Sequence, residues 1–567
     1  MKIKITFILL LFSNVICGQN TNRSLPYEEV IRQYKILDSL SVKSKLFTYE
    51  KTDCGEPLHL FVISQNEIFN PQILHEKKKC ILFINNGIHP GEPDGIDASL
   101  KLANNLNTNP IYNRLLENVV VCIIPVFNID GALERNCCSR ANQNGPEEYG
   151  FRGNAKNLDL NRDFIKADAS NTRSLINILR LWNPDVFIDT HVSDGADYQY
   201  TMTLISTQHN KLNTIQGDFM KQKLNPALFE RMKEKNDEMI PYVQTINDEE
   251  IPDSGIVGFL ETPRFLSGYM ALYNTYSFLS ESHMLKPFDQ RVKSTYNILL
   301  SLIEVSSEKK DDIIDTRNKA NDATLKMKNY FFNWKLDKTK KEAIHFKGFS
   351  AAYKKSDVTG ATRLYYDREK PYDKLISFYD DYYPSDSIKI PKYFFISQAW
   401  NEIIERLEKS GVKLIKIEND SSASMTATYI TDYETVKEPY EGHYLHYNVK
   451  TRTENQMIKI KKGDYLLLMP QPNMRYALET LIPRAVDSYF CWGFFDSFLQ
   501  QKEWFSSYVY EEVAADLLLK DKNLKNEFEK WKLINPNEDE YSQLNYIFQH
   551  SPNFEKTYRR YPIFSCY

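Results

Sequence analysis

At residues 81–92 the chain reads Ile-Leu-Phe-Ile-Asn-Asn-Gly-Ile-His-Pro-Gly-Glu, a short apolar run that ends in a turn and is followed at once by polar residues. Apolar and polar residues do not alternate in this run, which is typical of a strand covered on both faces. Similar runs occur at residues 119–126, 184–189 and 277–280. Helical spacing of apolar residues is found at residues 98–106 and 175–182. The sequence therefore predicts an α/β fold, with helices on both sides of a largely parallel or mixed sheet.

Three residues whose side chains can bind a metal or transfer protons follow the predicted strands closely: His89, His191 and Glu281. Open α/β sheets bind their ligands at the carboxyl ends of the strands. We therefore expect these side chains to meet at one edge of the sheet.

Two of these residues belong to a pattern that predicts a metal site. His89 and Glu92 are separated by two residues, so one loop can deliver both, and His191 supplies a third ligand from another strand. Two histidines and one glutamate form a known ligand set of hydrolytic zinc, which keeps a fourth position for water. Gly87 and Gly91 favour a turn that brings the backbone close to a bound ion. The pattern predicts one zinc ion per chain.

A second group predicts how a substrate is held. In the run Asp159-Leu160-Asn161-Arg162, the Arg162 guanidinium can grip a carboxylate through two parallel hydrogen bonds, and Asn161 adds a donor. Arg152 can supply positive charge to an oxyanion that forms on a scissile carbonyl. Glu281 follows a buried strand, where a carboxylate needs a metal, water or cation as partner. Together with the metal pattern, these residues indicate a zinc hydrolase that cuts next to a free carboxylate.

The segments that carry these residues resemble the signatures of the zinc carboxypeptidases of the M14 (carboxypeptidase A-like) family. They are residues 85–92 (Asn-Asn-Gly-Ile-His-Pro-Gly-Glu), 157–164 (Asn-Leu-Asp-Leu-Asn-Arg-Asp-Phe), 189–191 (Asp-Thr-His) and 281–283 (Glu-Ser-His). Order and approximate spacing agree over roughly residues 25–305, although Pro90 stands where many members carry a smaller residue. The resemblance implies a central mixed, twisted sheet of about eight strands flanked by helices. Within this family, the chain resembles a secreted bacterial member with a C-terminal extension.

The resemblance also implies a role for each matching residue. Zinc would be bound by His89, Glu92 and His191. Glu281 would act as general base and then as general acid, and Arg152 would stabilise the oxyanion. The terminal carboxylate of a peptide would be held by Asn161 and Arg162. The family further uses a mobile tyrosine that closes over the substrate. For that role we assign Tyr269, with Tyr273 and Tyr276 as competitors that no motif excludes.

The side-chain preference of the pocket depends on the irregular stretch between residues 240 and 275. Asp253 or Glu261 at the pocket floor would favour basic C-terminal residues. Phe259 or Leu266 there would favour apolar ones. No motif decides between these alternatives.

The pattern of the chain changes after residue 305. We divide the sequence into a signal peptide (1–18), a catalytic domain (25–305), a charged helical linker (306–330) and a mostly β C-terminal domain of unknown role (331–567). Strands are predicted at residues 457–460 and 465–468, and helices at residues 398–409, 475–481 and 511–531.

The N-terminus predicts export. Lys2 and Lys4 precede an apolar run over residues 5–12, which is too short to anchor the chain stably in a bilayer, and small residues follow it. We expect Sec-dependent export to the periplasm or the extracellular space, with cleavage near Cys17 or Gly18. A lipoprotein attached through Cys17 is the minor alternative, because residues 14–16 lack the small side chains expected before an acylated cysteine.

Composition excludes some other classes of protein. A net charge of −4 without a basic stripe gives no footprint for nucleic acid. No further apolar run approaches the roughly 18 residues of a membrane span. The cysteines show no regular spacing, so the fold does not depend on a disulfide framework. Cys137-Cys138 is predicted to be structural, through a bridge elsewhere, rather than metal-binding.

Two other functions fit parts of the pattern. A zinc amidase or carboxypeptidase that acts on cell-wall muropeptides or small acyl amides would use the same ligands, and muropeptide stems also end in carboxylates. A non-catalytic module would bind a partner without turnover, but the joint presence of the metal pattern, Arg152 and Glu281 argues against it. We therefore expect a peptide or muropeptide substrate.

Overall fold

The computed structural model describes residues 22–65 and 67–567. The predicted signal peptide and Cys17 lie outside these residues. Within the described part of the chain, no helix combines the length and apolar character that a membrane crossing requires.

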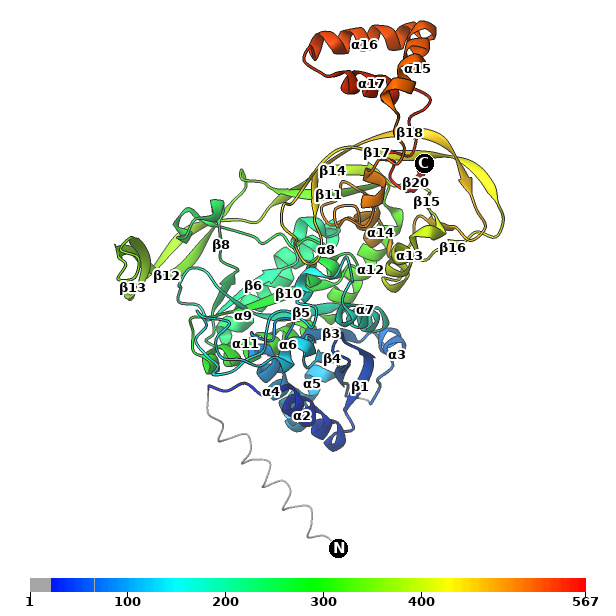
Figure 1. Cartoon of the computed structure of the whole chain (residues 1–567). Helices are drawn as coiled ribbons and strands as arrows, with labels where there is room; N and C mark the ends of the chain where they lie inside the picture. The colour runs from blue at the N-terminus through cyan, green and yellow to red at the C-terminus, as the bar shows by residue number, and fades with distance from the viewer. Residues whose placement is uncertain (1–21, 66) are drawn as a thin grey trace, which may run out of the picture.

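The core of the molecule is an eight-stranded mixed sheet, as the sequence predicts (Figure 1). Its strands follow the order β1-β2-β4-β3-β5-β10-β6-β7. They are β1 (Ser44–Lys51), β2 (Pro57–Ile63), β3 (Cys80–Asn85), β4 (Val119–Ile124), β5 (Val186–Ser193), β6 (Met202–Ser206), β7 (Met239–Pro241) and β10 (Tyr276–His283). The central strands β4, β3, β5 and β10 run parallel to one another. Every residue of β3, β4 and β5 is buried, which accounts for the apolar runs over residues 80–84, 119–124 and 186–188.

Helices cover this sheet. The longer ones are α2 (Tyr27–Leu40), α4 (Asp94–Thr108), α7 (Ser170–Trp182), α9 (Asn225–Glu234), α11 (Phe288–Glu308) and α12 (Lys310–Lys326). The shorter ones are α3 (Pro71–Glu76), α5 (Asn113–Leu116), α6 (Ile129–Leu133), α8 (Thr214–Phe219) and α10 (Leu266–Ala271). Helices α4 and α11 pack against each other and against strands of the sheet, while α7 lies against β1 and β2 and α10 against β5 and β10.

The C-terminal region is rich in β-structure. One sheet has the order β16-β19-β15-β20-β17-β18, and a two-stranded ribbon pairs β11 with β14. These strands are β11 (Asn329–Leu336), β14 (Tyr382–Lys389), β15 (Tyr393–Ile396), β16 (Ile415–Lys416), β17 (Ser421–Thr435), β18 (His446–Ile460), β19 (Tyr465–Leu468) and β20 (Ile563–Cys566). Helices α13 (Asn401–Lys409) and α14 (Met474–Leu481) form where the apolar spacing predicts them.

The two regions are interlocked rather than joined by a free linker. A four-stranded sheet combines β8 (Gln244–Thr245) and β9 (Ile256–Val257) with β12 (Glu342–Lys355) and β13 (Thr362–Tyr379). Helix α12, in the stretch predicted as a linker, packs on the catalytic region, where Arg317 forms a buried ion pair with Asp185 at 2.9 Å. One hydrophobic cluster contains residues of both regions.

Three helices, α15 (Ser507–Lys520), α16 (Lys522–Ile534) and α17 (Glu540–Gln549), project from this body (Figure 1). The sequence predicts one helix over residues 511–531, but the structure has two. Asp521 ends the first and caps the second, because its side chain accepts hydrogen bonds from the N–H groups of Asn523 and Leu524. Tyr510, Leu524 and Phe548 belong to a small core of their own.

Candidate zinc carboxypeptidase site

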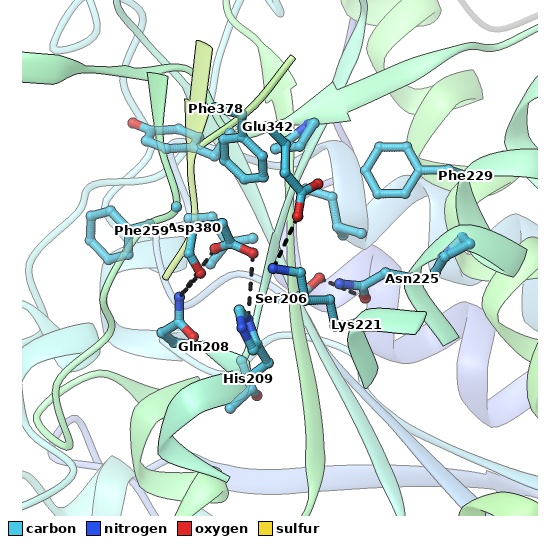
Figure 2. A pocket seen from close by; sticks show the side chains of 17 residues that line it. Ser206, Gln208, His209, Lys221, Asn225, Phe229, Phe259, Glu342, Phe378 and Asp380 are labelled. Atoms are coloured by element: carbon cyan, nitrogen blue, oxygen red, sulfur yellow. Dashed lines mark hydrogen bonds and ion pairs between the residues drawn. The ribbon is translucent and has the colours of Figure 1, made fainter. Parts of the chain in front are cut away.

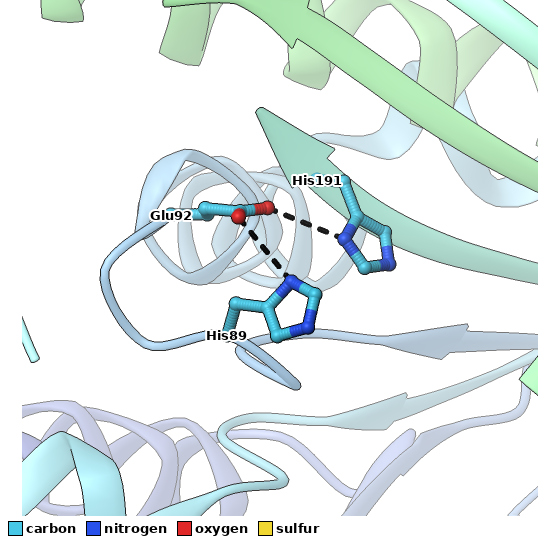
Figure 3. Close-up of side chains that lie close together, drawn as sticks. All are labelled: His89, Glu92 and His191. Atoms are coloured by element: carbon cyan, nitrogen blue, oxygen red, sulfur yellow. Dashed lines mark ion pairs between the residues drawn. The ribbon is translucent and has the colours of Figure 1, made fainter. Parts of the chain in front are cut away.

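The loop after β3 places the first two predicted ligands. Gly87 ends the strand with a φ of +66°, in the left-handed region, where a side chain would also press on Ile96 at 3.1 Å. The turn then carries His89 and Glu92 to the carboxyl edge of the sheet, where His191 arrives on β5. Their ligand atoms all lie within 4.8 Å of one another (Figure 3).

Both histidine rings are held in one orientation. Nδ1 of His89 and Nδ1 of His191 each lie 3.2 Å from a Glu92 oxygen. Nε2 of His89 is 2.9 Å from Asp159, and Nε2 of His191 is 3.0 Å from Asp189. A carboxylate on the far nitrogen fixes the tautomer and turns the near nitrogen towards a metal. The two Nδ1 atoms and the Glu92 carboxylate therefore fit a zinc ion.

The charges around Glu92 favour its ionised form. Burial alone would raise the pKa of Glu92, but the charges of Arg140 and His89 outweigh it and hold the pKa well below its usual range. Arg140 contributes a 2.8 Å ion pair to the same carboxylate. Glu92 is thus already a carboxylate, the form in which it binds a metal.

Glu281 lies beside the metal-binding residues. On the parallel strands β5 and β10, Glu281 and His191 are direct partners in register. The Glu281 Oε2 atom is buried and has no hydrogen-bond partner among the described residues. Burial raises the pKa of Glu281 to about 8, against the opposing charge of His191. A carboxyl group held free at this position can exchange protons with a molecule in the pocket.

Arg152, Asn161 and Arg162 line the same cavity, whose volume is about 280 Å³. The backbone turns here through a short 3-10 segment, η2 (Leu160–Arg162). Arg152 donates to Asp159 at 3.0 Å and lies 3.4 Å from Glu92. The Arg162 guanidinium lies over the Phe265 ring at 4.3 Å. The pocket is thus lined by both arginine and carboxyl side chains.

Comparison with known proteins agrees with this geometry. A family model described as zinc carboxypeptidase matches residues 39–212, which include His89, Glu92 and His191. Carboxypeptidase 2 of Trichophyton tonsurans is 23% identical over 489 residues, covering 80% of this chain and 81% of that protein. Residues 39–212 therefore form a zinc carboxypeptidase domain.

Other relatives of this zinc carboxypeptidase match less of its length. Carboxypeptidase SOL1 of Arabidopsis thaliana is 33% identical over 127 residues, or 21% of each chain. A solved metallo-carboxypeptidase from Burkholderia cenocepacia is 15% identical, with a TM-score of 0.38 over 51% of this chain and 71% of that one. Residues 1–330 are less than two thirds of the chain, so the 80% alignment with the Trichophyton enzyme also includes part of the C-terminal region.

Tyr269 does not lie in the pocket of the carboxypeptidase. The side chain is 1% exposed, and its hydroxyl group contacts Ser410 and Tyr273. Tyr276 is also buried, with its hydroxyl group on Thr316. The structure instead brings Tyr242 to the wall of the pocket. It follows β7 in an irregular stretch, and no sequence signal distinguishes it from its neighbours.

Two of the four residues considered for side-chain preference line the carboxypeptidase pocket, namely Phe259 and Glu261. Asp253 lies outside it and contacts Lys374, and Leu266 is fully buried in α10. Glu261 is 3% exposed, and burial raises its pKa to about 7. Neither carboxylate oxygen has a hydrogen-bond partner within the part of the chain that the structure describes.

Arg140 is, with Tyr242, a site residue that the sequence did not predict. It lies in an irregular loop without a motif, where the neighbouring Cys137 and Cys138 form a disulfide with each other. The disulfide agrees with the structural role expected for these cysteines, but they bridge each other and not a cysteine elsewhere in the chain. Only the folded loop shows that Arg140 reaches Glu92.

A second cavity of about 220 Å³ adjoins the pocket of the carboxypeptidase (Figure 2). Ile205, Tyr242 and Phe259 line both spaces. Its charged groups pair across the two regions of the chain: His209 with Asp380 at 3.5 Å and Lys221 with Glu342 at 3.1 Å. Each of these ion pairs joins a residue of the catalytic region to a residue of the C-terminal region. They therefore hold the C-terminal region beside the wall that the two cavities share.

Proposed function

We propose that this carboxypeptidase hydrolyses the last peptide bond of peptides that end in a free carboxylate, with Glu281 as general base and general acid. The observation that carries the proposal is that a free Glu281 oxygen and Arg162 share one pocket with the metal-binding residues. A peptide whose carboxylate is on Arg162 would present its last bond to Glu281.

His89, Glu92 and His191 would hold the zinc ion. Bound zinc supplies Lewis acidity, which lowers the pKa of water from about 15.7 towards 7. Glu281 would accept the proton of the attacking water and return it to the departing amine. Arg152, which is partly exposed beside Glu92, would donate hydrogen bonds to the developing oxyanion. Asn161 and Arg162 would hold the terminal carboxylate.

The side chain of the C-terminal residue to be removed would lie against Tyr242 and Phe259, beside Glu261. A buried carboxylate without a partner is stabilised by a cation. The charge of Lys211 lowers the pKa of Glu261, but Lys211 Nζ bonds the backbone oxygen of Glu261 and leaves the carboxyl group without a direct cation partner. We therefore propose a preference for C-terminal lysine or arginine, whose apolar stem would contact the aromatic rings.

Digestion of a mixed peptide library tests the reaction. Mass spectrometry should show loss of single C-terminal residues with zinc-loaded wild type and not with Glu281→Gln. If the wild type trims purified muropeptides but not ordinary peptides, the substrate is a muropeptide. If it trims neither, peptide hydrolysis is refuted.

The proposal extends to location. The apolar N-terminal run supports export, so the substrates would be peptides outside the cytoplasm. N-terminal sequencing of the mature protein should find a start near Gly18. An uncleaved N-terminus on protein that stays in the cytoplasm would refute export.

A further inference from the structure

A tight turn of the C-terminal region reaches the catalytic region. Tyr440 and His443 close the turn through two backbone hydrogen bonds, of 2.7 and 3.0 Å. Between them Glu441 has a φ of +50° and Gly442 a φ of +81°. A glutamate in the left-handed region is uncommon, and here the two backbone hydrogen bonds of the turn and the contact of the Glu441 side chain with Asp159 hold it there. We call residues 440–443 the 440–443 turn.

The 440–443 turn contacts the segment that carries the proposed carboxylate-binding residues. Arg162 donates from Nε to the Tyr440 hydroxyl group at 3.1 Å. Asp159 donates its backbone N–H to Glu441 Oε2 at 2.7 Å. His443 Nε2 lies 2.7 Å from Asp168. Three contacts thus join two segments that are far apart in the sequence.

The C-terminal region itself fixes the position of the turn. Tyr440 stacks on the fully buried Trp492 with a centroid distance of 6.2 Å. The ring of His443 packs against Trp492 and Phe494. Trp492 belongs to the hydrophobic cluster shared by both regions and Phe494 packs against it, so these contacts attach the turn to the core.

The contacts leave one side of Arg162 available. Nε bonds Tyr440, one Nη1 hydrogen bonds the backbone oxygen of Asn161 at 2.9 Å, and the plane lies on Phe265. A guanidinium has five N–H groups, so one on Nη1 and two on Nη2 have no hydrogen-bond partner among the described residues, although Nη1 also lies 3.9 Å from an Asp159 carboxylate oxygen. An N–H of Nη1 and an N–H of Nη2 together can form the parallel pair of hydrogen bonds that a carboxylate accepts.

We propose that the C-terminal region completes the substrate-carboxylate subsite, with Tyr440 as a positioning residue for Arg162 and Glu441 as a positioning residue for the Asp159 backbone. The inference rests on the proposed exopeptidase function. It gives the C-terminal region a role in substrate recognition, because the catalytic region alone lacks both supports.

Tyr440→Phe removes only the hydroxyl group and tests the first contact. Tyr444→Phe is the matched control, because Tyr444 lies on the same segment and is 52% exposed. For peptides with a free C-terminus, Tyr440→Phe should raise KM about three- to tenfold, the range for the loss of one typical hydrogen bond. We expect kcat to change less than twofold. The ratio of kcat/KM between free and amidated peptides should fall. An unchanged KM, or equal losses on both peptides, would overturn the role of Tyr440.

A binding measurement separates this inference from the proposed reaction. In the Glu281→Gln background, calorimetry gives Kd for a free-ended peptide and its amide. Adding Tyr440→Phe should reduce the preference for the free end about three- to tenfold. This result would support the subsite even if wild type cleaved no peptide. An unchanged preference would overturn the inference even if cleavage were established.

Glu441 is tested through its backbone contact. Glu441→Ala should raise KM for free-ended peptides, and Glu441→Gln should restore most of the loss, because its amide oxygen can accept from the Asp159 N–H. Glu438→Gln, at an exposed neighbouring position, is the control. Equal KM values for Glu441→Ala and wild type would show that the turn does not position this segment.

Discussion

Asp189→Asn should weaken zinc binding while leaving the fold intact. The Asp189 side chain is fully buried; one oxygen contacts His191 Nε2 at 3.0 Å, and the other accepts a 2.9 Å hydrogen bond from the Asn85 amide. Asparagine has the same shape but only one acceptor oxygen, so one of the two partners would face an NH2 group. Replacing such a support of a metal ligand typically lowers metal affinity about 10- to 100-fold, or about 1.4 to 2.7 kcal/mol. Because water cannot reach Asp189 to compensate, we expect the upper half of this range.

The assay is competition with a zinc chelator at pH 7, which gives Kd without relying on turnover. Asp97→Asn is the control, because Asp97 is an aspartate of α4 that bonds neither histidine. It should bind zinc as tightly as wild type. A wild-type Kd for Asp189→Asn would refute the argument that Asp189 orients His191 towards the metal.

Three other outcomes are expected. Free zinc at 100 times its Kd should stabilise the protein by about 2.7 kcal/mol, seen as a rise in Tm, and elemental analysis should find one zinc per chain; an unchanged Tm would contradict a built site. Glu261→Gln should lower kcat/KM about tenfold for peptides ending in lysine or arginine but not in phenylalanine, and equal effects would exclude a role in preference. Although burial alone would raise the pKa of Asp168, His443 and Lys166 outweigh it and hold the pKa below its ordinary 3.8. This carboxylate therefore stabilises the fold above pH 3.8, and the contribution disappears as pH falls through the lower folded pKa. The Tm deficit of Asp168→Asn should accordingly shrink on acidification, and a constant deficit would refute the argument.

The sheet could be predicted because its central strands are buried on both faces. A continuous apolar run such as residues 81–84 is too short for a membrane span and lacks the spacing of an amphipathic helix, so it favours a buried strand. The metal-binding residues could be predicted because two of them share one loop, and because the carboxyl ends of parallel strands meet. Here local sequence and global topology lead to the same position.

Long-range contacts could not be predicted. Arg140 reaches Glu92 from a loop without periodicity, and Arg162 meets Tyr440 across 278 positions. No local pattern records which of 36 tyrosines lies near an arginine in space. Tyr269 illustrates the same limit, since its motif-like surroundings do not show that Ser410 and Tyr273 enclose its hydroxyl group. The break at Asp521 was missed for another reason, because apolar spacing continues through a capping residue.

The bond between Asp159 and Glu441 has a consequence for the order in which the molecule matures. It closes a loop of 282 positions, and the entropy of closing so long a loop must be lost before the contact can form. A ribosome delivers residue 159 long before residue 441, so the strands that carry the zinc ligands can assemble while the support of Arg162 is still absent. We therefore expect nascent or C-terminally truncated chains to bind metal but to bind and hydrolyse free-ended peptides poorly. The chain would then become fully active only after its synthesis is complete.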